Sequence, residues 1–540
     1  MRQQPGESKG PSMAGIWAEI LFITAIFAAV GGWPVPDVNE AVYLTKARHF
    51  ADPAWGRGDF FLETPDAHGI FYLLLGPLAA RLPLEQAAWI GRLAGWLALA
   101  TGFRHAVAPL VATRWGRLAA AAAFAIVMEQ TTMAGEWVIG GCEAKVFAWA
   151  FLFAALGELV RGRFETAWLS LGAATAVHPI VGGWGMAAAV ATRLVGDFRP
   201  AHFRPLAAAA LLGGGLALAA VGIGPALALS GGVDDVERAA ATGIYVVDRL
   251  HHHLLPRAFP APMVARHLLA VVAWWLLQRL APATLPRSRA TAFTLASLAI
   301  SLAGFAISLA EPFAPDATLG LLRFYWFRIA DVLVPFALVT AAVAVLEDDD
   351  CCRRLFPARP ATVRAGVAIL LVAGLAAHAS HWPLPGRAAI RPRADAKVQS
   401  AAWTAICDWV RDNTPVDSCF LTPRGAASFT WRTGRREVVA WKNSPQDARS
   451  LLEWRRRIVD CFAADPAGVA DGDRMPADLE RSTASLGAER MRQVAKRYGA
   501  DHAIVPVDVP GLASLPWKPL HANDGYAVYR LDDAPSDAAP

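Results

Sequence analysis

Two groups of carboxylates in the first third of the chain have residue types and spacing suited to chemistry. Asp37 and Glu40 are separated by two residues. Glu136 and Glu143 lie on either side of two adjacent glycines in the stretch GEWVIGGCEAK, which ends at Lys145. A carboxylate held beside a hydroxyl group can take its proton as a general base. Oxygen ligands also suit a divalent cation, so Asp37 and Glu40 are candidate ligands for Mg²⁺ or Mn²⁺. These four acids are the candidate catalytic residues.

Each group also has a purely structural interpretation. On a helix that begins near Val38, Asp37 would be the N-cap residue and Glu40 the third helical residue, which is the arrangement of a capping box. Glu143 would lie in the first turn of the next helix, where the helix dipole favours an acid and Lys145 can neutralise it. A residue that stabilises a helix start can still do chemistry, so both interpretations stay open.

Basic residues with aromatic neighbours are a second kind of candidate. The segment RFYWFRIAD places Arg323, Tyr325 and Arg328 at the start of a long apolar stretch. Arginine binds phosphate through two parallel hydrogen bonds, and aromatic rings are common where lipid meets water. The alternative for Arg328 is an ion pair with Asp331, three residues further along one helix. We therefore expect Arg323 or Arg328 to bind an anion.

Histidine residues and one further arginine extend this set. His178 precedes a proline and two glycines that break an apolar stretch, which suggests either a break that lines a cavity or a tight hairpin. The run His251–His253 follows Arg249, but adjacent side chains cannot all face one ion and no Cys/His spacing completes a zinc site, so we expect a solvated loop. The candidate substrate-binding residues are His68, Lys145, His178, Arg249, Arg323, Tyr325 and Arg328.

The composition indicates that a membrane holds these residues. Of 540 residues, 55% are hydrophobic and only 18% are charged, with a mean hydropathy of +0.34. A soluble protein carries about 25% charged residues. A net charge of +5 is compatible with nucleic-acid binding, but the basic residues lie mostly in short loops between apolar segments, as membrane topology predicts. We therefore expect a lipid-bilayer partner and no nucleic acid.

The predicted fold class is a polytopic α-helical membrane protein of about eleven spans with a C-terminal extracytoplasmic α/β domain. Residues 1–390 would form the transmembrane domain and 391–540 the soluble domain. A span needs about 20 apolar residues. The expected spans are 13–32, 87–110, 117–133, 144–160, 165–179, 183–195, 206–230, 263–280, 290–310, 326–346 and 362–380. The pair 165–179 and 183–195 has one long broken helix as its alternative, and 70–82 is short enough to be interfacial or re-entrant.

The orientation follows from Lys and Arg in the short loops, which collect on the inner side. With the N-terminus inside, an odd number of spans puts the C-terminal domain outside, together with a long first outer loop, 33–86. The candidate residues then lie at the outer ends of several spans. Because ionisable groups near a membrane are costly unless they are paired or face a cavity, this gathering predicts an outward-facing functional site.

The last 150 residues predict a small layered fold. Apolar runs CFLT, EVVAW, HAIVPV and YAVYRL alternate with helical stretches 398–412, 446–463 and 486–498. Nucleotide-binding and hydrolase motifs are absent from this segment. Arg424 and Lys442 stand just past strand ends, where open sheets bind ligands. Three cysteines, Cys407, Cys419 and Cys461, would allow one disulfide bond in an external domain, with the pairing left open.

The chain also resembles a known superfamily. The segments PDVNEAVYLTKARHFADP, DAHGIFYLLLGPLAARL and AAWIGRLAGWLALATGF are similar to the N-terminal third of GT-C-type glycosyltransferases. WVRDNTPVDSCFLTPRG, GRREVVAWKNSP, RYGADHAIV and NDGYAVYRL resemble the external domain that closes many such proteins. The resemblance covers most of the chain and is nearest to an uncharacterised bacterial membrane-protein family related to these enzymes. It implies a multi-pass protein of the bacterial inner membrane that uses a polyprenyl-phosphate-linked sugar.

The resemblance also implies roles for the candidate residues. Asp37 would be the general base toward an acceptor hydroxyl, Glu40, Glu136 and Glu143 would support it, and Arg323 or Arg328 would bind the lipid phosphate of an inverting reaction. Acids in this superfamily are commonly adjacent or one residue apart, whereas Asp37 and Glu40 are three apart, so metal binding does not follow from the likeness. The alternatives are a transporter or flippase of a lipid-linked or polar substrate, for which no internal repeat is visible, and a catalytically inactive relative.

Overall fold

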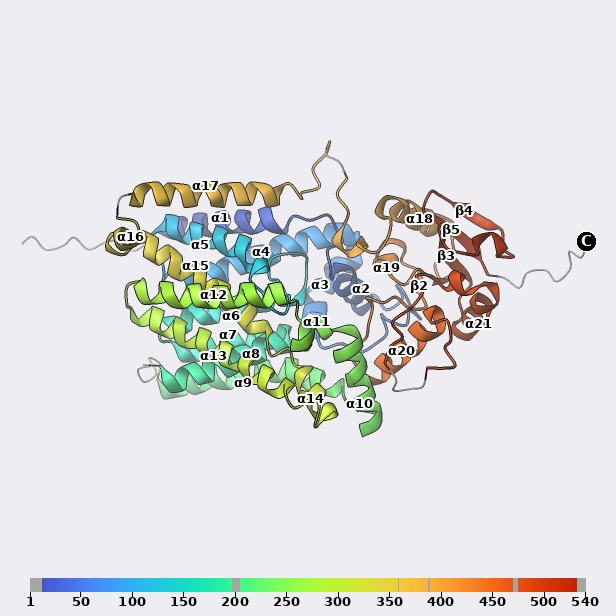
Figure 1. The fold of residues 1–540 in the computed structure, drawn as a ribbon, viewed down its shortest axis with the longest axis horizontal. Helices are drawn as coiled ribbons and strands as arrows, with labels where there is room; N and C mark the ends of the chain where they lie inside the picture. The colour runs from blue at the N-terminus through green and yellow to red at the C-terminus, as the bar shows by residue number, and fades with distance from the viewer. Residues whose placement is uncertain (1–11, 197–203, 358, 387–388, 470–473, 532–540) are drawn as a thin grey trace, which may run out of the picture.

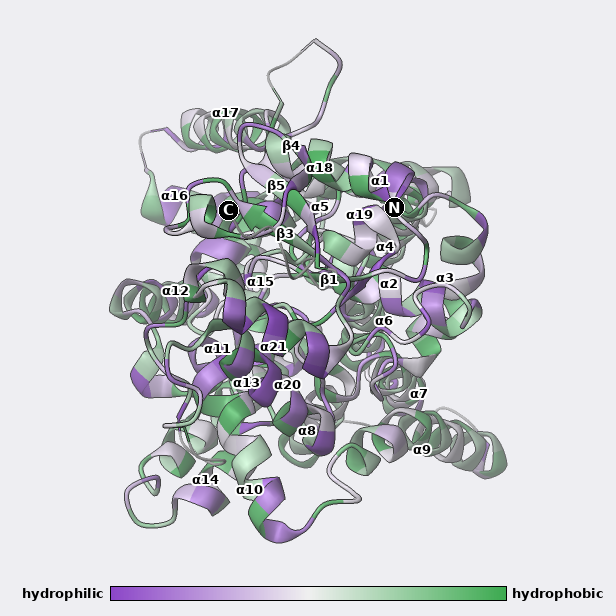
Figure 2. Ribbon diagram, turned by 90° about the vertical axis from the view of Figure 1, so that its right-hand side faces the viewer, coloured by the Kyte–Doolittle hydropathy of each residue, from purple (hydrophilic) through white to green (hydrophobic). Residues whose placement is uncertain are grey.

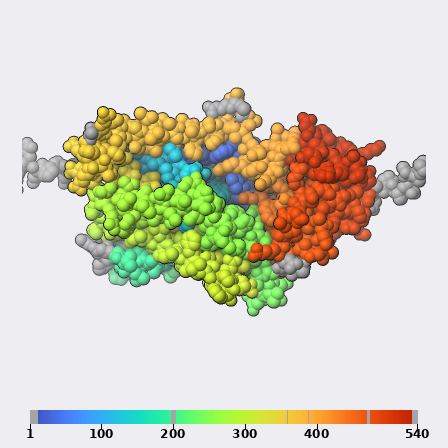
Figure 3. Space-filling model, in the orientation of Figure 1, coloured from blue at the N-terminus to red at the C-terminus, as the bar shows by residue number. Residues whose placement is uncertain are grey.

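The computed structural model describes residues 12–196, 204–357, 359–386, 389–469 and 474–531. It consists of a helical bundle with a smaller α/β domain packed against one end (Figure 1). A space-filling view shows this domain covering that end of the bundle (Figure 3).

Every segment expected to span the membrane is a helix. These helices are α1 (Met13–Gly31), α4 (Leu84–Val107), α5 (Arg114–Val127), α6 (Ala144–Val160), α7 (Phe164–Val177), α8 (Pro179–Val195), α9 (Pro205–Ala228), α12 (Ala261–Leu280), α13 (Leu285–Ser308), α15 (Arg328–Glu347) and α17 (Pro360–Ala379). Within the described ranges, six of them are long and apolar enough to cross a membrane, namely α1, α9, α12, α13, α15 and α17. The predicted multi-span helical fold with a C-terminal α/β domain is confirmed, and the count of eleven spans stays a prediction.

The bundle packs around α15, most of which is buried, whereas α17 has no buried residue and lies along the outside. Phe103 contacts Phe153 and Phe336 edge-on, with ring centroids 5.5 and 5.6 Å apart, and so joins α4, α6 and α15. A Cβ on Gly102 would lie 2.2 Å from the carbonyl oxygen of Ala150, so only glycine permits this approach of α4 and α6. Peripheral helices such as α9 carry mostly hydrophobic residues on their outer faces (Figure 2).

The break at His178 is a hairpin between two helices. His178 caps α8, and a Cβ on Gly182 would lie 2.1 Å from the backbone nitrogen of Thr175 on α7. Because α8 therefore turns back against α7, the alternative of one long broken helix is wrong.

Short helices collect at the end of the bundle that faces the α/β domain. The loop between α1 and α4 forms α2 (Glu40–Ala51) and α3 (Gly69–Arg81), the latter at the segment expected to be interfacial or re-entrant. The same end holds η1 (Met128–Gln130), α10 (Asp235–Gly243), η2 (Ile244–Arg249), α11 (His251–Leu254), η3 (Pro256–Ala258) and α14 (Pro315–Leu322). Helix α16 (Asp349–Leu355) lies at the opposite end (Figure 1).

The C-terminal domain is a five-stranded sheet with helices, as its alternating apolar runs predict. Its elements are η4 (Arg393–Asp395), α18 (Ser400–Asn413), β1 (Cys419–Leu421), α19 (Phe429–Thr433), β2 (Arg436–Glu437), α20 (Ala448–Phe462), η5 (Thr483–Leu486), α21 (Ala488–Tyr498), β3 (His502–Pro506), η6 (Leu512–Ser514), β4 (Pro519–Ala522) and β5 (Tyr526–Arg530). The strand order is β2-β1-β3-β5-β4, parallel through β2, β1 and β3 and antiparallel beyond. All six cysteines are buried free thiols, so the disulfide bond considered for this domain is not formed.

A pair of buried carboxyl groups joins loop 33–86 to this domain. Asp59 accepts a hydrogen bond from the backbone nitrogen of Glu437 at 3.0 Å, and both side chains are almost fully buried. Burial, followed by the nearby charge of Asp59, raises the pKa of Glu437 to about 8. Burial likewise raises the pKa of Asp59.

This pair makes the stability of the protein depend on pH. A carboxyl group whose pKa is raised by folding stabilises the fold fully below its ordinary pKa, and that contribution is lost as the pH rises to about 8. We expect the thermal midpoint of the wild type in micelles to fall between pH 5.5 and 8.5, and the Glu437→Gln variant to lose much of this slope. The exposed Glu489 provides the control, because Glu489→Gln should keep the wild-type profile. Parallel profiles for Glu437→Gln and the wild type would contradict the assignment.

Candidate functional site

A cavity of about 260 Å³ lies between the bundle and the α/β domain. All the residues predicted to be functional line it except Asp37 and Glu40: these are His68, Glu136, Glu143, Lys145, His178, Arg249, Arg323, Tyr325 and Arg328. They come from loops far apart in the sequence and meet because the same ends of their helices face the α/β domain. That domain contributes Lys442, Ser444 and Gln446 to the wall.

One wall of the cavity carries two carboxylates with an ammonium group between them. The Nζ of Lys145 lies 3.6 Å from Glu136 and 3.5 Å from Glu143, and 3.2 Å from the centre of the Trp137 ring. The amide of Asn39 donates to Oε2 of Glu143 at 3.1 Å, while Oε1 of Glu143 has no hydrogen-bond partner. Burial raises the pKa of Glu143, and the charge of Lys145 opposes this only in part. Glu143 therefore combines a held side chain with a free oxygen, as a proton acceptor requires.

The glycine-rich stretch before Glu143 permits this placement. Glu143 is the N-cap residue of α6. A Cβ on Gly141 would lie 2.6 Å from Cγ of Glu40, so the turn can pack against α2 only without a side chain. Glu143 thus lies one residue before the first turn in which it was expected, with the expected charge partner Lys145, and it is a buried residue of the cavity lining.

Arg328 forms an ion pair with Glu136, which belongs to a different loop. Its Nε lies 2.7 Å from Glu136, its guanidinium group stacks 3.9 Å above the ring of Tyr325, and its Nη1 is 3.4 Å from His178. Asp331 instead accepts hydrogen bonds from the backbone of residues 133, 134 and 136. The alternative ion pair between Arg328 and Asp331 is therefore wrong.

Arg323 lies beside an apolar part of the cavity. Its Nη1 donates to the hydroxyl of Ser230 at 3.1 Å, and in the described part of the chain it forms no ion pair with a carboxylate. The apolar lining is formed by Ile180, Ala226, Leu229 and Phe324. A guanidinium group that has no acidic partner and lies next to an apolar wall suits a ligand with an anionic head and a hydrocarbon tail.

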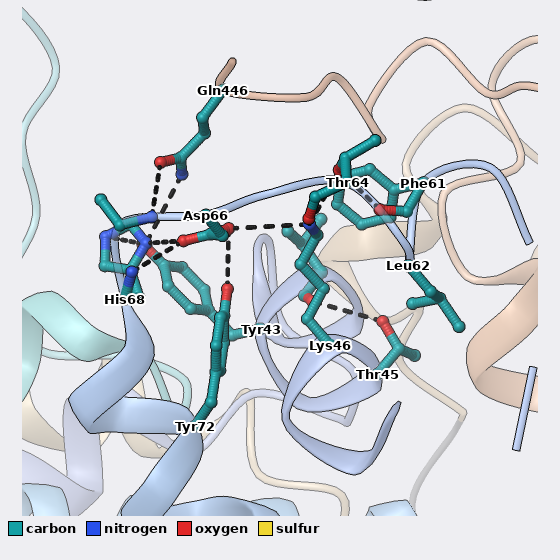
Figure 4. Close-up of polar contacts among 12 residues, drawn as sticks. Tyr43, Thr45, Lys46, Phe61, Leu62, Thr64, Asp66, His68, Tyr72 and Gln446 are labelled. Atoms are coloured by element: carbon teal, nitrogen blue, oxygen red, sulfur yellow. Dashed lines mark hydrogen bonds and ion pairs between the residues drawn. The ribbon is translucent and has the colours of Figure 1, made fainter. Parts of the chain in front are cut away.

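His68 is held by a polar network in loop 33–86 (Figure 4). Asp66 lies 2.5 Å from Nδ1 of His68 and accepts the hydroxyl of Tyr72 at 2.8 Å, with Lys46 3.9 Å away. Burial tends to raise the pKa of Asp66, but His68 and Lys46 hold it well below its usual range. The imidazole is thus fixed with its other nitrogen 3.5 Å from the hydroxyl of Tyr43, on the cavity side.

Asp37 and Glu40 lie behind the cavity wall, each paired with an arginine. Arg393 contacts both oxygens of Asp37 at 2.5 and 2.7 Å, and Arg92 contacts both oxygens of Glu40 at 2.6 and 2.5 Å. Although burial tends to raise the pKa of Asp37, Arg393 lowers it below its ordinary value. Helix α2 begins at Glu40, not near Val38, and only half of the capping box forms, through the bond from the nitrogen of Asp37 to Glu40.

These contacts do not fit a divalent cation at Asp37 and Glu40. Both carboxylates already have guanidinium partners, and Glu40 also accepts from the backbone nitrogens of Asp37 and Cys142. Across the described ranges, no group of three or more His, Cys, Asp or Glu residues could hold a metal ion. We therefore assign no chemical step to a metal.

Comparisons with known proteins give one family model and several solved structures. Residues 401–461 match the model of a domain of unknown function (DUF6798), and no curated protein matches the chain. The chain is similar to the archaeal oligosaccharyltransferase AglB from Archaeoglobus fulgidus, solved with an inhibitory peptide and a dolichol-phosphate, at 12% identity over 91% of this chain and 69% of that one, with a TM-score of 0.41. It is also similar to arabinofuranosyltransferase AftD from mycobacteria at 15% identity over 97% of this chain and 42% of that one, with a TM-score of 0.44. A third similar structure is ArnT from Cupriavidus metallidurans bound to undecaprenyl phosphate, at 13% identity over 96% and 98% of the chains, with a TM-score of 0.37.

Several partners of the predicted site residues were not themselves predicted, among them Arg92, Arg393 and Gln446. Arg92 is a fully buried arginine inside an apolar helix, which is itself a signal of a polar partner. Arg393, in RPRADAK, has no such signal, because it lies 356 residues from Asp37. Gln446, within the segment matched by the family model, contacts loop 33–86 by accepting a hydrogen bond from the backbone nitrogen of Ala67 at 3.4 Å.

Proposed function

We propose that this protein is a membrane-embedded glycosyltransferase that moves a sugar from a polyprenyl-phosphate donor to an acceptor. The observation that carries the proposal is a single cavity that contains a carboxylate with a free oxygen, Glu143, and an arginine without an acidic partner, Arg323, beside an apolar wall. Glycosyl transfer needs these three features, namely a base, a cation for the departing phosphate and a place for the lipid.

The donor would bind at the Arg323 side of the cavity. The lipid tail would lie along Ala226, Leu229 and Phe324, at the end of α9, whose outer face is exposed and apolar. The phosphate would then accept hydrogen bonds from Arg323. Because the phosphate gains negative charge as the sugar leaves, a fixed guanidinium group stabilises the transition state more than the bound donor.

The acceptor would bind at the Glu143 side. Its hydroxyl oxygen forms a bond to the anomeric carbon of the sugar, the hydroxyl proton passes to Glu143, and the bond from the anomeric carbon to the phosphate oxygen breaks with its electron pair on the phosphate. Attack from the face opposite the phosphate inverts the anomeric configuration. Asn39 and Lys145 hold the carboxylate in place, and Glu136 holds Lys145 and Arg328.

We further propose that the cavity faces outward from the bacterial inner membrane. The inner loops of the predicted topology are richer in Lys and Arg, and the α/β domain lies at the bundle end opposite α16, which follows the inner end of α15 in that topology. The acceptor would then be a glycan, lipid or protein on the outer face.

Reconstitution in proteoliposomes tests this function. The purified chain would be supplied with a panel of radiolabelled polyprenyl-phosphate sugars and an envelope-lipid or glycan extract. We expect labelled product and an equal amount of free polyprenyl phosphate. Arg323→Met should weaken donor binding about tenfold or more, because it removes a charge-assisted contact to the phosphate. Arg481→Met, at an exposed ion pair outside the cavity, is the matched control and should behave as the wild type.

Two results would contradict the proposal. Movement of the lipid-linked sugar between leaflets without free polyprenyl phosphate would favour a transporter or flippase. Donor binding that depends on Arg323, without transfer for any donor, would favour an inactive relative.

A further inference from the structure

Two cations of the cavity have no role in the reaction described above. Arg249, at the end of η2, belongs to the bundle, and Lys442 belongs to the α/β domain. They are neighbours across the seam, because Nη2 of Arg249 lies 3.4 Å from the carbonyl oxygen of Lys442. The cavity is therefore lined by two adjacent positive charges that different domains provide.

Neither cation is neutralised by an acid. Lys145 and Arg328 each contact a carboxylate, whereas Arg249 and Lys442 form no ion pair in the ranges that the structure describes. Arg249 is only 9% exposed, and its Nε has no hydrogen-bond partner. A buried charge without a partner is costly, so this arrangement favours occupation by an anion.

Lys442 is held in place by its neighbours. Asn443 donates to Glu437 at 2.5 Å, Gln446 accepts from the backbone of Ala67, and the nitrogen of Ala448 donates to the carbonyl of Leu229 at the end of α9 at 3.0 Å. Figure 4 shows Gln446 reaching the loop that carries His68. These contacts hold the backbone that carries Lys442 at the cavity wall.

The electrostatics support the same conclusion. Burial, followed by the charge of Arg249, lowers the pKa of Lys442 to about 8, and the charge of Glu143 offsets this only in part. Burial also lowers the pKa of Arg249. An anion between the two side chains would remove their mutual repulsion and restore the charged form of Lys442.

We propose that Arg249 and Lys442 form a second anion subsite, which binds a phosphate or carboxylate group of a substrate in addition to the lipid phosphate at Arg323. The inference rests on the proposed function for the identity of the ligand. The anion has two chemically equivalent sources, which are the second phosphate of a lipid diphosphate donor and an acidic group on the acceptor. In either case, the α/β domain takes part in substrate recognition through Lys442.

Equilibrium binding of inorganic pyrophosphate to the detergent-solubilised full chain tests the subsite. We expect Lys442→Met and Arg249→Met each to raise the dissociation constant about tenfold or more, and Lys442→Arg to retain binding. Lys496→Met, on the exposed face of α21, is the matched control. A thermal unfolding curve for each variant separates loss of binding from loss of folding. Unchanged pyrophosphate affinity in folded Lys442→Met and Arg249→Met would overturn the proposal.

Two further measurements identify the source of the anion. In nanodiscs, the wild type would bind polyprenyl diphosphate more tightly than polyprenyl phosphate if the subsite belongs to the donor. Lys442→Met would then remove this preference. If the subsite belongs to the acceptor, the wild type would bind glucuronate more tightly than glucose, and Lys442→Met would remove that preference. These assays detect binding alone. Absence of sugar transfer would therefore contradict the proposed function but not the anion subsite. Sugar transfer by the wild type, together with anion binding that Lys442→Met and Arg249→Met leave unchanged, would contradict the subsite but not the proposed function.

Discussion

Replacement of Glu143 by glutamine is expected to reduce sugar transfer by a factor of about 10²–10⁴, the usual contribution of a positioned general base. The amide keeps the size of the side chain and can still accept from Asn39, so donor binding and thermal stability should stay near those of the wild type. The measurement is the rate of product formation in proteoliposomes at saturating donor, together with donor affinity. A fall in rate without a fall in affinity separates a chemical role from a binding role.

The comparison with Asp37→Asn decides between two candidate bases. Asp37 faces Arg393 and not the cavity, so Asp37→Asn should lower stability more than Glu143→Gln does. Glu85→Gln, at an exposed acid of α4, controls for loss of one negative charge. If Asp37→Asn abolished transfer in a folded protein while Glu143→Gln kept it, the base would be Asp37, as the superfamily resemblance implies, and Arg393 would have to move during the reaction.

The fold could be predicted from the sequence because its signals are local. Each span is a continuous apolar stretch, and lipid requires every backbone group within it to be satisfied by the helix itself. Strands β1, β3 and β5 of the α/β domain are equally visible as short apolar runs. Strand β2 is the charged pair Arg436–Glu437 at the start of the run EVVAW, and β4 consists of the mostly exposed residues Pro519–Ala522 at the edge of the sheet. The presence of Glu136, Glu143 and Arg323 in one cavity could also be predicted, because the topology alone places all three at the same end of the helical bundle.

The partners of the acidic residues could not be predicted, because they are set by tertiary packing. Asp37 and Glu143 have similar sequence surroundings, since each precedes a helix, yet one meets Arg393 from the interdomain segment and the other faces the cavity. Lys442 could be noted as a residue past a strand end. Its approach to Arg249 depends on how the α/β domain packs on the bundle, which no local pattern encodes.

The ion pair between Arg92 and Glu40 gives the largest expected effect on stability. Both side chains are fully buried, and Arg92 also donates to the carbonyl of Trp33. Arg92→Met would leave Glu40 charged without its partner, and removal of one member of a buried pair costs about 3–5 kcal/mol. We therefore expect a large fall in the thermal midpoint in micelles. Arg411→Met breaks exposed pairs with Asp408 and Asp412 and should cost at most about 1 kcal/mol.

A double variant shows whether the unpaired charge is the cause. Arg92→Met combined with Glu40→Gln removes the charge as well as its partner, so it should recover part of the lost stability. Glu40 also accepts from the backbone of Asp37 and Cys142, and Cys142 precedes Glu143, so the pair positions the cavity wall. Arg92→Met should consequently lower transfer even at temperatures where the protein is folded. Equal stability of Arg92→Met and Arg411→Met would contradict this prediction. It would mean that Glu40 either pairs with another cation or becomes protonated when Arg92 is removed.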